Sequence, residues 1–113
     1  MAYDETLSAR FRAALGDRAG LSEKKMMGSL CFFLAGNMIG GASRSKDGVG
    51  RFLFRVGKEN QAAALTRDGA YVMEMGGRRM SGFVSFNEEN CNDESFKDCL
   101  DLALGFVGTL PPK

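Results

Sequence analysis

The spacing of apolar residues changes along the chain, from a helical repeat near each end to strand-like runs in between. A repeat of three to four residues places side chains on one face of a helix, whereas alternation places them on one face of a strand. Near the N-terminus the helical repeat comprises Tyr3, Leu7, Phe11, Ala14 and Leu15. Asp4 precedes this repeat as a helix N-cap, and Gly16 ends it. The polar face of the expected helix carries Ser8, Arg10 and Arg12.

Glycine-rich turns divide the middle of the chain into expected strands. The first three strands are expected at residues 26–34, 38–44 and 51–56. Short connections between them favour an antiparallel meander. Gly36 and Asn37 accept the positive φ of a tight turn between the first two strands. Gly40 and Gly41 indicate a bulge or the close approach of another backbone.

The second half of the chain returns to helical spacing. Its expected elements are a helix at 58–67, strands at 71–75 and 83–86 separated by a tight turn at 76–79, and a last helix that Asp93 caps. The apolar stripe of the last helix comprises Phe96, Cys99, Leu100, Ala103, Leu104 and Val107. Gly105 and Gly108 are expected to let the end of this helix approach the sheet closely.

Together these elements predict one two-layer α+β domain over residues 1–113, with the helices on one face of the sheet. The expected order is helix, three-strand antiparallel meander, helix, two strands, helix. Phe52, Phe54 and Val56 face one way and alternate with Arg51, Leu53 and Arg55, as in a sheet with one buried face. A chain of 113 residues suffices for one core, and 44% hydrophobic residues is a globular composition.

The sequence contains no histidine, and this removes the commonest catalytic arrangements. Ser-His-Asp triads, Cys-His pairs and histidine metal ligands all depend on that residue. The serines do not follow the GxSxG pattern, and the glycines form neither common phosphate-binding motif. Acidic pairs at 88–89 and 93–94 lack the spacing of a calcium loop. We therefore expect no enzymatic activity, no metal site and no cofactor.

The three cysteines indicate a reducing compartment, because their number is odd and they form no CxxC pair. Cys31 and Cys99 lie in apolar segments and are expected in the core, where burial makes a thiol inert. Cys91 follows a polar stretch and is expected to be more exposed. No run reaches the roughly 18 apolar residues of a membrane-spanning helix. These features predict a cytoplasmic protein with no membrane contact.

Charge is nearly balanced, with a formal net charge of +1. Proteins that hold nucleic acid through its phosphates usually carry a strongly basic face, so direct nucleic-acid binding is expected to be weak. The candidate partner-contact residues are the local basic ones: Lys24, Lys25, Arg51, Arg55, Arg78 and Arg79. Arg78 and Arg79 can equally form the solvated tip between two strands.

Seven methionines lie mostly in or beside the expected strands. They have two interpretations: they fill the core, or they form an adaptable exposed face for a partner. A different function, a small-molecule or peptide-binding module that uses an open sheet face or a groove between two copies, predicts a concave apolar pocket near Phe52, Phe54 and the methionines.

The order of several short motifs resembles one known family from end to end. These are SEKKMMGSLCF at 22–32, GNM at 36–38 followed by Gly40, FRVG at 54–57, Gly77-Arg78 with Met80, and GFV at 82–84. Together they resemble the N-terminal domain of TfoX, also called Sxy. Because the resemblance covers the whole chain, we expect a stand-alone member without the C-terminal TfoX domain.

The resemblance implies a two-layer α+β fold and a regulatory function. TfoX-type proteins are associated with bacterial natural-competence genes and act with the cyclic-AMP receptor protein. The family has no established catalytic residues. We therefore expect a non-enzymatic regulator of transcription or competence genes that acts through protein contacts, with itself or a transcription regulator, and that can form a homodimer. The alternative is a small-molecule or peptide-binding module.

Overall fold

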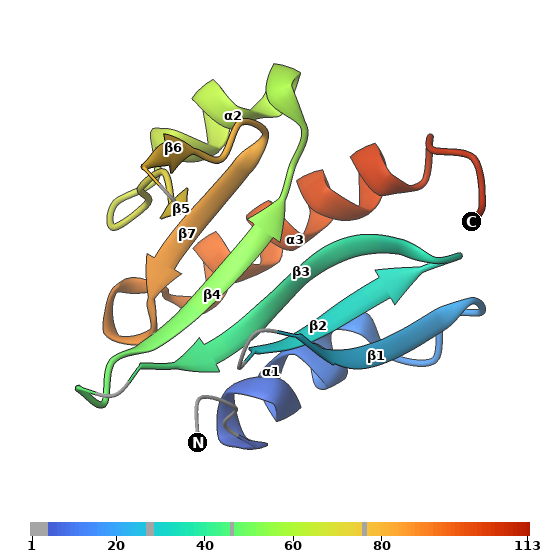
Figure 1. Cartoon of the computed structure of the whole chain (residues 1–113), viewed down its shortest axis with the longest axis horizontal. Coiled ribbons are helices and arrows are strands. Elements are labelled where there is room, and N and C mark those ends of the chain that lie inside the picture. The colour runs from blue at the N-terminus through green and yellow to red at the C-terminus, as the bar shows by residue number, and fades with distance from the viewer. Residues whose placement is uncertain (1–4, 27–28, 46, 76) are drawn as a thin grey trace.

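The computed structural model describes residues 5–26, 29–45, 47–75 and 77–113. Over these residues, three helices accompany an antiparallel sheet of order β1-β2-β3-β4-β7 (Figure 1). The helices are α1 (Glu5–Leu15), α2 (Lys58–Leu65) and α3 (Asp93–Val107). The strands of the sheet are β1 (Leu21–Met26), β2 (Ser29–Leu34), β3 (Asn37–Arg44), β4 (Gly50–Arg55) and β7 (Phe83–Asn87). The predicted α+β class and the order helix, strands, helix, strands, helix are confirmed.

A cluster of phenylalanines packs helices α1 and α3 against one face of the sheet. The Phe11 ring of α1 stacks on Phe32 with centroids 4.9 Å apart, and it meets Phe96 of α3 edge-on at 5.2 Å. Phe52 and Phe54 lie beneath both helices and are fully buried, as the alternation along β4 predicts. Aromatic pairs at these distances stabilise a core by about 0.5–1.5 kcal/mol beyond the burial of their area.

The expected strand at 26–34 begins too early, because only β2 (Ser29–Leu34) forms there, and a further strand, β1, precedes it at Leu21–Met26. β1 and β2 pair antiparallel from Leu21↔Leu34 to Met26↔Ser29, so the meander has four strands instead of three. Residues 22–26 of β1 are all exposed, since β1 is an edge strand. A polar edge strand carries no apolar alternation, and the sequence pattern therefore misses it. The residues between the two strands, 27 and 28, lie outside the described residues.

The expected strand at 71–75 is also only partly correct. Tyr71 pairs with Ser85 on the outer edge of β7 through two backbone hydrogen bonds of 2.9 and 2.8 Å. The chain then leaves the sheet and forms a two-stranded ribbon of β5 (Glu74–Met75) and β6 (Arg78–Arg79). Arg78 and Arg79 therefore lie in a strand and not in the expected turn at 76–79, of which residue 76 is outside the described residues.

Helix α3 begins one residue earlier than expected. Its N-cap is Asn92, whose Oδ1 accepts a hydrogen bond from the Ser95 amide at 2.8 Å, and Asp93 is the first helical residue. The expectation for Gly105 is wrong, because it is exposed and a Cβ there would meet nothing within 4 Å. Gly108 is exposed as well and caps the helix end, its amide donating to the Leu104 carbonyl oxygen.

Helix α1 ends as expected at Gly16, which has φ 65° and donates its amide to the Arg12 carbonyl. Its proposed cap, Asp4, and Tyr3 lie outside the described residues. Two side chains depart from the expected faces: Ser8 is fully buried and Ala14 is exposed. The face of this short helix is therefore rotated slightly from the one that the apolar repeat indicates.

The glycine pair in β3 has the close backbone approach that was expected. The β2–β3 register shifts between Phe32 and Phe33, which leaves Ile39 as an extra residue in β3. A Cβ at Gly40 would lie 2.1 Å from the Leu53 carbonyl oxygen, and one at Gly41 would lie 2.9 Å from that of Leu30. Only glycine lets the neighbouring strands approach this closely.

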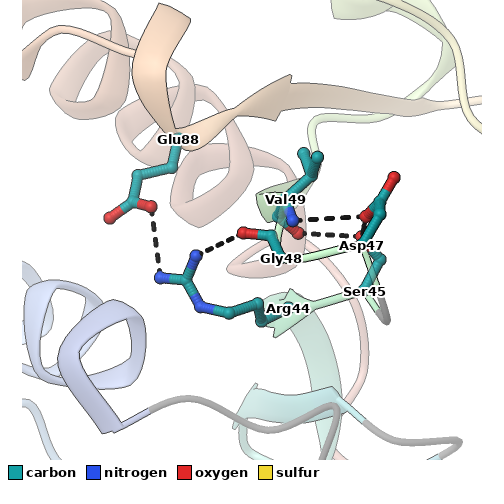
Figure 2. A network of polar contacts seen from close by, with 6 residues as sticks. All are labelled: Arg44, Ser45, Asp47, Gly48, Val49 and Glu88. Atoms are coloured by element: carbon teal, nitrogen blue, oxygen red, sulfur yellow. Dashed lines mark hydrogen bonds and ion pairs between the residues drawn. The ribbon is translucent and has the colours of Figure 1, made fainter.

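A polar network holds the connection between β3 and β4 (Figure 2). Arg44 donates to the Gly48 carbonyl at 2.6 Å and to Glu88 Oε1 at 3.2 Å. The Ser45 hydroxyl and the Val49 amide donate to Asp47, and these two bonds together with the nearby Arg51 charge lower the pKa of that carboxyl. The network ties the sheet end to the start of the short 3-10 helix η1 (Glu88–Asn90) and has a structural function.

Candidate functional site

The face of the sheet opposite the phenylalanine cluster is the first candidate surface. Successive strand residues point to opposite faces, so the residues that alternate with Phe52 and Phe54 lie on this reverse face. The pairing register places Lys24, Cys31, Gly41 and Leu53 side by side on it, in one row across β1 to β4. Figure 1 shows β2, β3 and β4 unobstructed on the side away from α1 and α3. Helices α1 and α3 thus leave this face uncovered, although Cys31, Gly41 and Ser85 on it are buried.

A hollow of about 220 Å³ lies on this reverse face. Its lining, called the methionine hollow below, comprises Met26, Ser29, Cys31, Met38, Gly41, Ser43, Arg51, Phe52, Leu53, Met73 and Met80. Small residues on the central strands form its floor, because Gly41 has no side chain and Ser29, Cys31 and Ser43 have short ones. Longer side chains from β1, β3, β4 and the segment around the β5–β6 ribbon form its walls.

The walls of the methionine hollow are apolar and partly open to solvent. Met26 has 38% of its surface exposed and is the one exposed large hydrophobic residue among those described. Met38, Leu53, Met73 and Met80 are half-buried. Methionine has three rotatable bonds and a polarisable sulfur, so it adapts to differently shaped partners. A hollow beside the methionines and next to Phe52 is present, but the rings of Phe52 and Phe54 both lie on the covered face.

Two of the six predicted basic residues flank the methionine hollow. Arg51 is part of its lining, and Lys24 is directly opposite Cys31 on the edge strand. Lys25 faces the other way, because it pairs with the core residue Leu30. The adjacent residues Lys24 and Lys25 of β1 therefore lie on opposite faces of the sheet.

The other three basic residues lie elsewhere. The Arg55 guanidinium lies over the Phe106 ring at 5.5 Å, at the end of the sheet. Arg78 and Arg79 are exposed on β6, where their backbones pair with Met75 and Glu74. The structure therefore does not gather the six candidates into one basic patch.

A second cavity, of about 490 Å³, lies at the end of the sheet beside the start of α2. Its lining includes Arg55, Lys58, Glu59, Phe83 and Phe106. The chain enters the helix through Gly57, which has φ 90° and supplies no side-chain cap. A Cβ at that position would overlap the Phe106 ring at 2.6 Å, so glycine keeps this end of the cavity open.

The cysteines of the structure are buried thiols. The expectation that Cys91 is exposed is wrong, since only 4% of its surface is accessible. Its carbonyl oxygen accepts a hydrogen bond from Arg10, whose guanidinium lies 4.6 Å from the Phe96 ring centre. Burial raises the pKa of Cys91 and of Cys99 to about 11, and it raises the pKa of Cys31 as well. At neutral pH all three thiols are protonated and therefore poorly nucleophilic.

The described part of the chain offers neither a metal site nor a membrane-spanning helix. It contains no group of three or more histidine, cysteine, aspartate or glutamate residues that could hold a metal ion. Within the same residues, every helix is too short or too polar to cross a membrane.

The floor of the methionine hollow is the part of the site that sequence reasoning missed. Ser29, Gly41 and Ser43 are unremarkable one by one, and they meet only because three strands pair in one register. No pattern in the sequence marks them, because β1 carries no apolar alternation from which its pairing with β2 could be read. Comparison with protein families, with curated proteins and with solved structures finds no match to this chain. The resemblance to the TfoX N-terminal domain therefore stays a prediction from its motifs.

Proposed function

We propose that this chain is a non-enzymatic binding domain that contacts a protein partner through the methionine hollow. The observation that carries the proposal is an apolar, partly open hollow on the sheet face that α1 and α3 leave uncovered. A sheet face with exposed apolar side chains gains free energy when a partner removes them from water. Methionine walls suit this role, because they repack around the side chains of a partner.

The size of the methionine hollow favours a protein side chain over a whole small molecule. Sites for drug-sized ligands usually enclose about 300–1,000 Å³, whereas this hollow has about 220 Å³. Such a volume accommodates one large apolar side chain of a partner, with the rest of the partner lying over the rim. The protonated state of Cys31 inside the hollow agrees with binding without covalent chemistry.

We further propose that the binding is regulatory, as in the TfoX-type proteins that the motifs at 22–32 and 36–38 resemble. In this proposal the domain acts in the bacterial cytoplasm on transcription or competence genes. Its partner is a transcription regulator, and direct contact with DNA contributes little. A homodimer is compatible with the proposal when it leaves the methionine hollow open.

The proposal is tested by filling the methionine hollow. Ser43→Trp places a large side chain on the floor, whereas Ala62→Trp adds the same group to an exposed position of α2. We expect the wild type and Ala62→Trp to capture the same partner from a lysate and Ser43→Trp to lose it. Thermal melts establish that both variants fold. Capture that survives Ser43→Trp in a folded chain contradicts the proposed site.

The second cavity favours a second candidate function, the binding of a small molecule. Its volume of about 490 Å³ lies in the range typical of such sites. Arg55 and Lys58 supply positive charge there, and Phe83 and Phe106 supply apolar surface. A fragment screen followed by amide chemical shifts tests this candidate. Shifts at Gly57 and Gly82 support it, whereas shifts confined to β2 and β3 assign the ligand to the methionine hollow.

A further inference from the structure

We infer that the partner segment in the methionine hollow is an acidic peptide that inserts one large apolar side chain between the methionines. The inference rests on the proposed function and specifies the chemistry of the partner. It depends on where the charges of the reverse face lie relative to the hollow.

Two cations stand on opposite sides of the hollow. Lys24 lies on β1 and Arg51 on β4, with the small floor residues of β2 and β3 between them. Among the described residues, neither Lys24 nor Arg51 takes part in an ion pair or side-chain hydrogen bond. Both charges are therefore available to a partner.

On the reverse face, the described residues of the sheet strands supply no carboxylate to pair with these cations. The residues that the strand register places on it run from Ser22 and Lys24 on β1 to Ser85 and Asn87 on β7, and none of these described residues is acidic. Asp47, which Arg51 influences electrostatically, lies in the loop before β4 and already accepts bonds from Ser45 and Val49. A segment that brings carboxylates to this face can thus form ion pairs that no described residue forms with Lys24 or Arg51.

The spacing of the two cations predicts the pattern of the peptide. β1 and β4 are separated by three strand-to-strand steps, or about 14 Å at roughly 4.8 Å per step. Lys24 is in line with Leu53, and Arg51 lies two residues further along β4, or about 7 Å, so the two backbone positions are about 16 Å apart. An extended peptide advances about 3.3 Å per residue, so about five residues span this distance. The favoured pattern is one leucine, methionine or phenylalanine with an aspartate or glutamate about two or three residues away on each side.

A second copy of the chain is a poorer occupant of the same surface. In a two-fold dimer the same patch meets itself, so Lys24 and Arg51 would approach the cations of the other copy. The described residues that the sheet strands place on this face include no acidic one, so no carboxylate among them would offset the repulsion. A nucleic acid is also disfavoured, since its phosphates would lie over methionine and leucine side chains.

The experiment is a selection from a phage-displayed library of random twelve-residue peptides on the immobilised full chain. We expect the selected peptides to carry the acidic–apolar–acidic pattern. Arg51→Glu and Lys24→Glu should each weaken their binding about tenfold, the effect of one charged contact. Lys25→Glu is the matched control, because the next residue of β1 faces the other side of the sheet. The affinity of the selected peptides for Lys25→Glu should differ less than twofold from their affinity for the wild type. A thermal melt checks that this variant is folded.

Each other outcome is decisive. Two outcomes would overturn the inference but not the proposed function. In both, the selected peptides do not bind Ser43→Trp; in the first they lack acidic residues, and in the second they bind Arg51→Glu as tightly as the wild type. A selection that yields no peptide sensitive to Ser43→Trp overturns both. Sedimentation that shows a dimer abolished by Ser43→Trp overturns the inference in favour of a second copy. Recovery of binding to Arg51→Glu by peptides with lysine in place of one acid confirms direct charge contact.

Discussion

At the scale of single residues, burial determines the chemistry of the three cysteines. Cys91 lies just before α3 beside Arg10 of α1, and Cys99 lies on the buried face of α3; desolvation is the main cause of their raised pKa. Positive charge on Arg10 and on Arg67 lowers the pKa of Cys91 and Cys99 respectively, but only partly offsets the effect of burial. The folded state therefore favours the neutral thiol, and stability depends on pH in the alkaline range.

The direction of that dependence follows from the pKa values. A thiol in the unfolded chain has a pKa of 9.0, and in the folded chain Cys91 and Cys99 have a pKa of about 11. Their contribution is complete below pH 9 and is lost as the pH rises through about 11, because the unfolded state ionises first. At about 1.36 kcal/mol per pKa unit, each thiol accounts for a loss on the order of 2 kcal/mol. Urea denaturation at pH 8, 9.5 and 11 measures this loss in the free energy of unfolding.

The control for this prediction is Cys99→Ala. Removing the side chain lowers stability at every pH through lost packing, but it should make the alkaline decline shallower than that of the wild type. Parallel declines for the two proteins would show that other groups, such as tyrosine and lysine, cause the whole effect.

Two glycines form a pair with opposite expected effects on stability. Gly40→Ala places a Cβ 2.1 Å from the Leu53 carbonyl oxygen, so β3 and β4 must separate. We expect a loss on the order of 3 kcal/mol or more, since backbone atoms cannot yield cheaply. Gly105→Ala meets nothing within 4 Å inside α3 and should gain about 0.5–1 kcal/mol. Urea denaturation of both variants tests this, and an equal effect of the two substitutions would contradict it.

At the scale of elements, the amphipathic helices and the central strands were predictable from their sequence, and the edges of the sheet were not. Helix α3 and strand β4 each bury one face, so a period of apolar residues marks them. Strand β1 buries almost nothing and is held by backbone pairing with β2, which leaves no side-chain pattern. The prediction of a strand at 71–75 was only partly correct, for another reason. Only Tyr71 pairs with β7, and the backbone of Glu74 and Met75 pairs with β6 in the β5–β6 ribbon.

The candidate site was predictable only in part, because it depends on strand register. The methionines and Arg51 were identified as candidates by residue type. Ser29 and Ser43, in contrast, can be identified as site residues only once they are known to lie beside Met26 and Leu53. A one-residue change in the pairing of β2 or β3 would move these serines to the covered face. The cap of α3 shows the same limit on a smaller scale, because Asn92 and Asp93 are both good capping residues.

Substitution distinguishes the two capping candidates. Asn92→Ala removes the acceptor of the Ser95 amide and should destabilise the chain by about 1 kcal/mol. Asp93→Ala removes only an exposed ion pair with Arg10, N···O distance 3.1 Å, and should have less than half that effect. Thermal denaturation at neutral pH gives both values. A larger loss for Asp93→Ala would mean that Asp93 and not Asn92 stabilises the start of the helix.

At the scale of the whole molecule, acidic residues around η1 and the first turn of α3 pair with arginines, whereas Lys24 and Arg51 on the reverse face do not pair with any described residue. Arg44 pairs with Glu88, Arg10 with Asp93 and Arg67 with Glu94. Two cations on the reverse face offer few contacts to the phosphates of a long duplex. This arrangement favours a small acidic ligand over an extended polyanion.

Binding to promoter DNA is accordingly expected to be weak and to depend little on salt. If Lys24 and Arg51 each neutralise one phosphate, the slope of log K against log salt concentration is about −2, at roughly 0.9 per contact. Affinity should then fall only roughly tenfold between 50 and 200 mM salt, and Arg51→Glu should make the slope shallower by about 1. Fluorescence anisotropy at several salt concentrations measures both quantities. A slope steeper than about −5 with micromolar affinity at 200 mM would show a true nucleic-acid interface and would contradict a domain that acts through protein contacts.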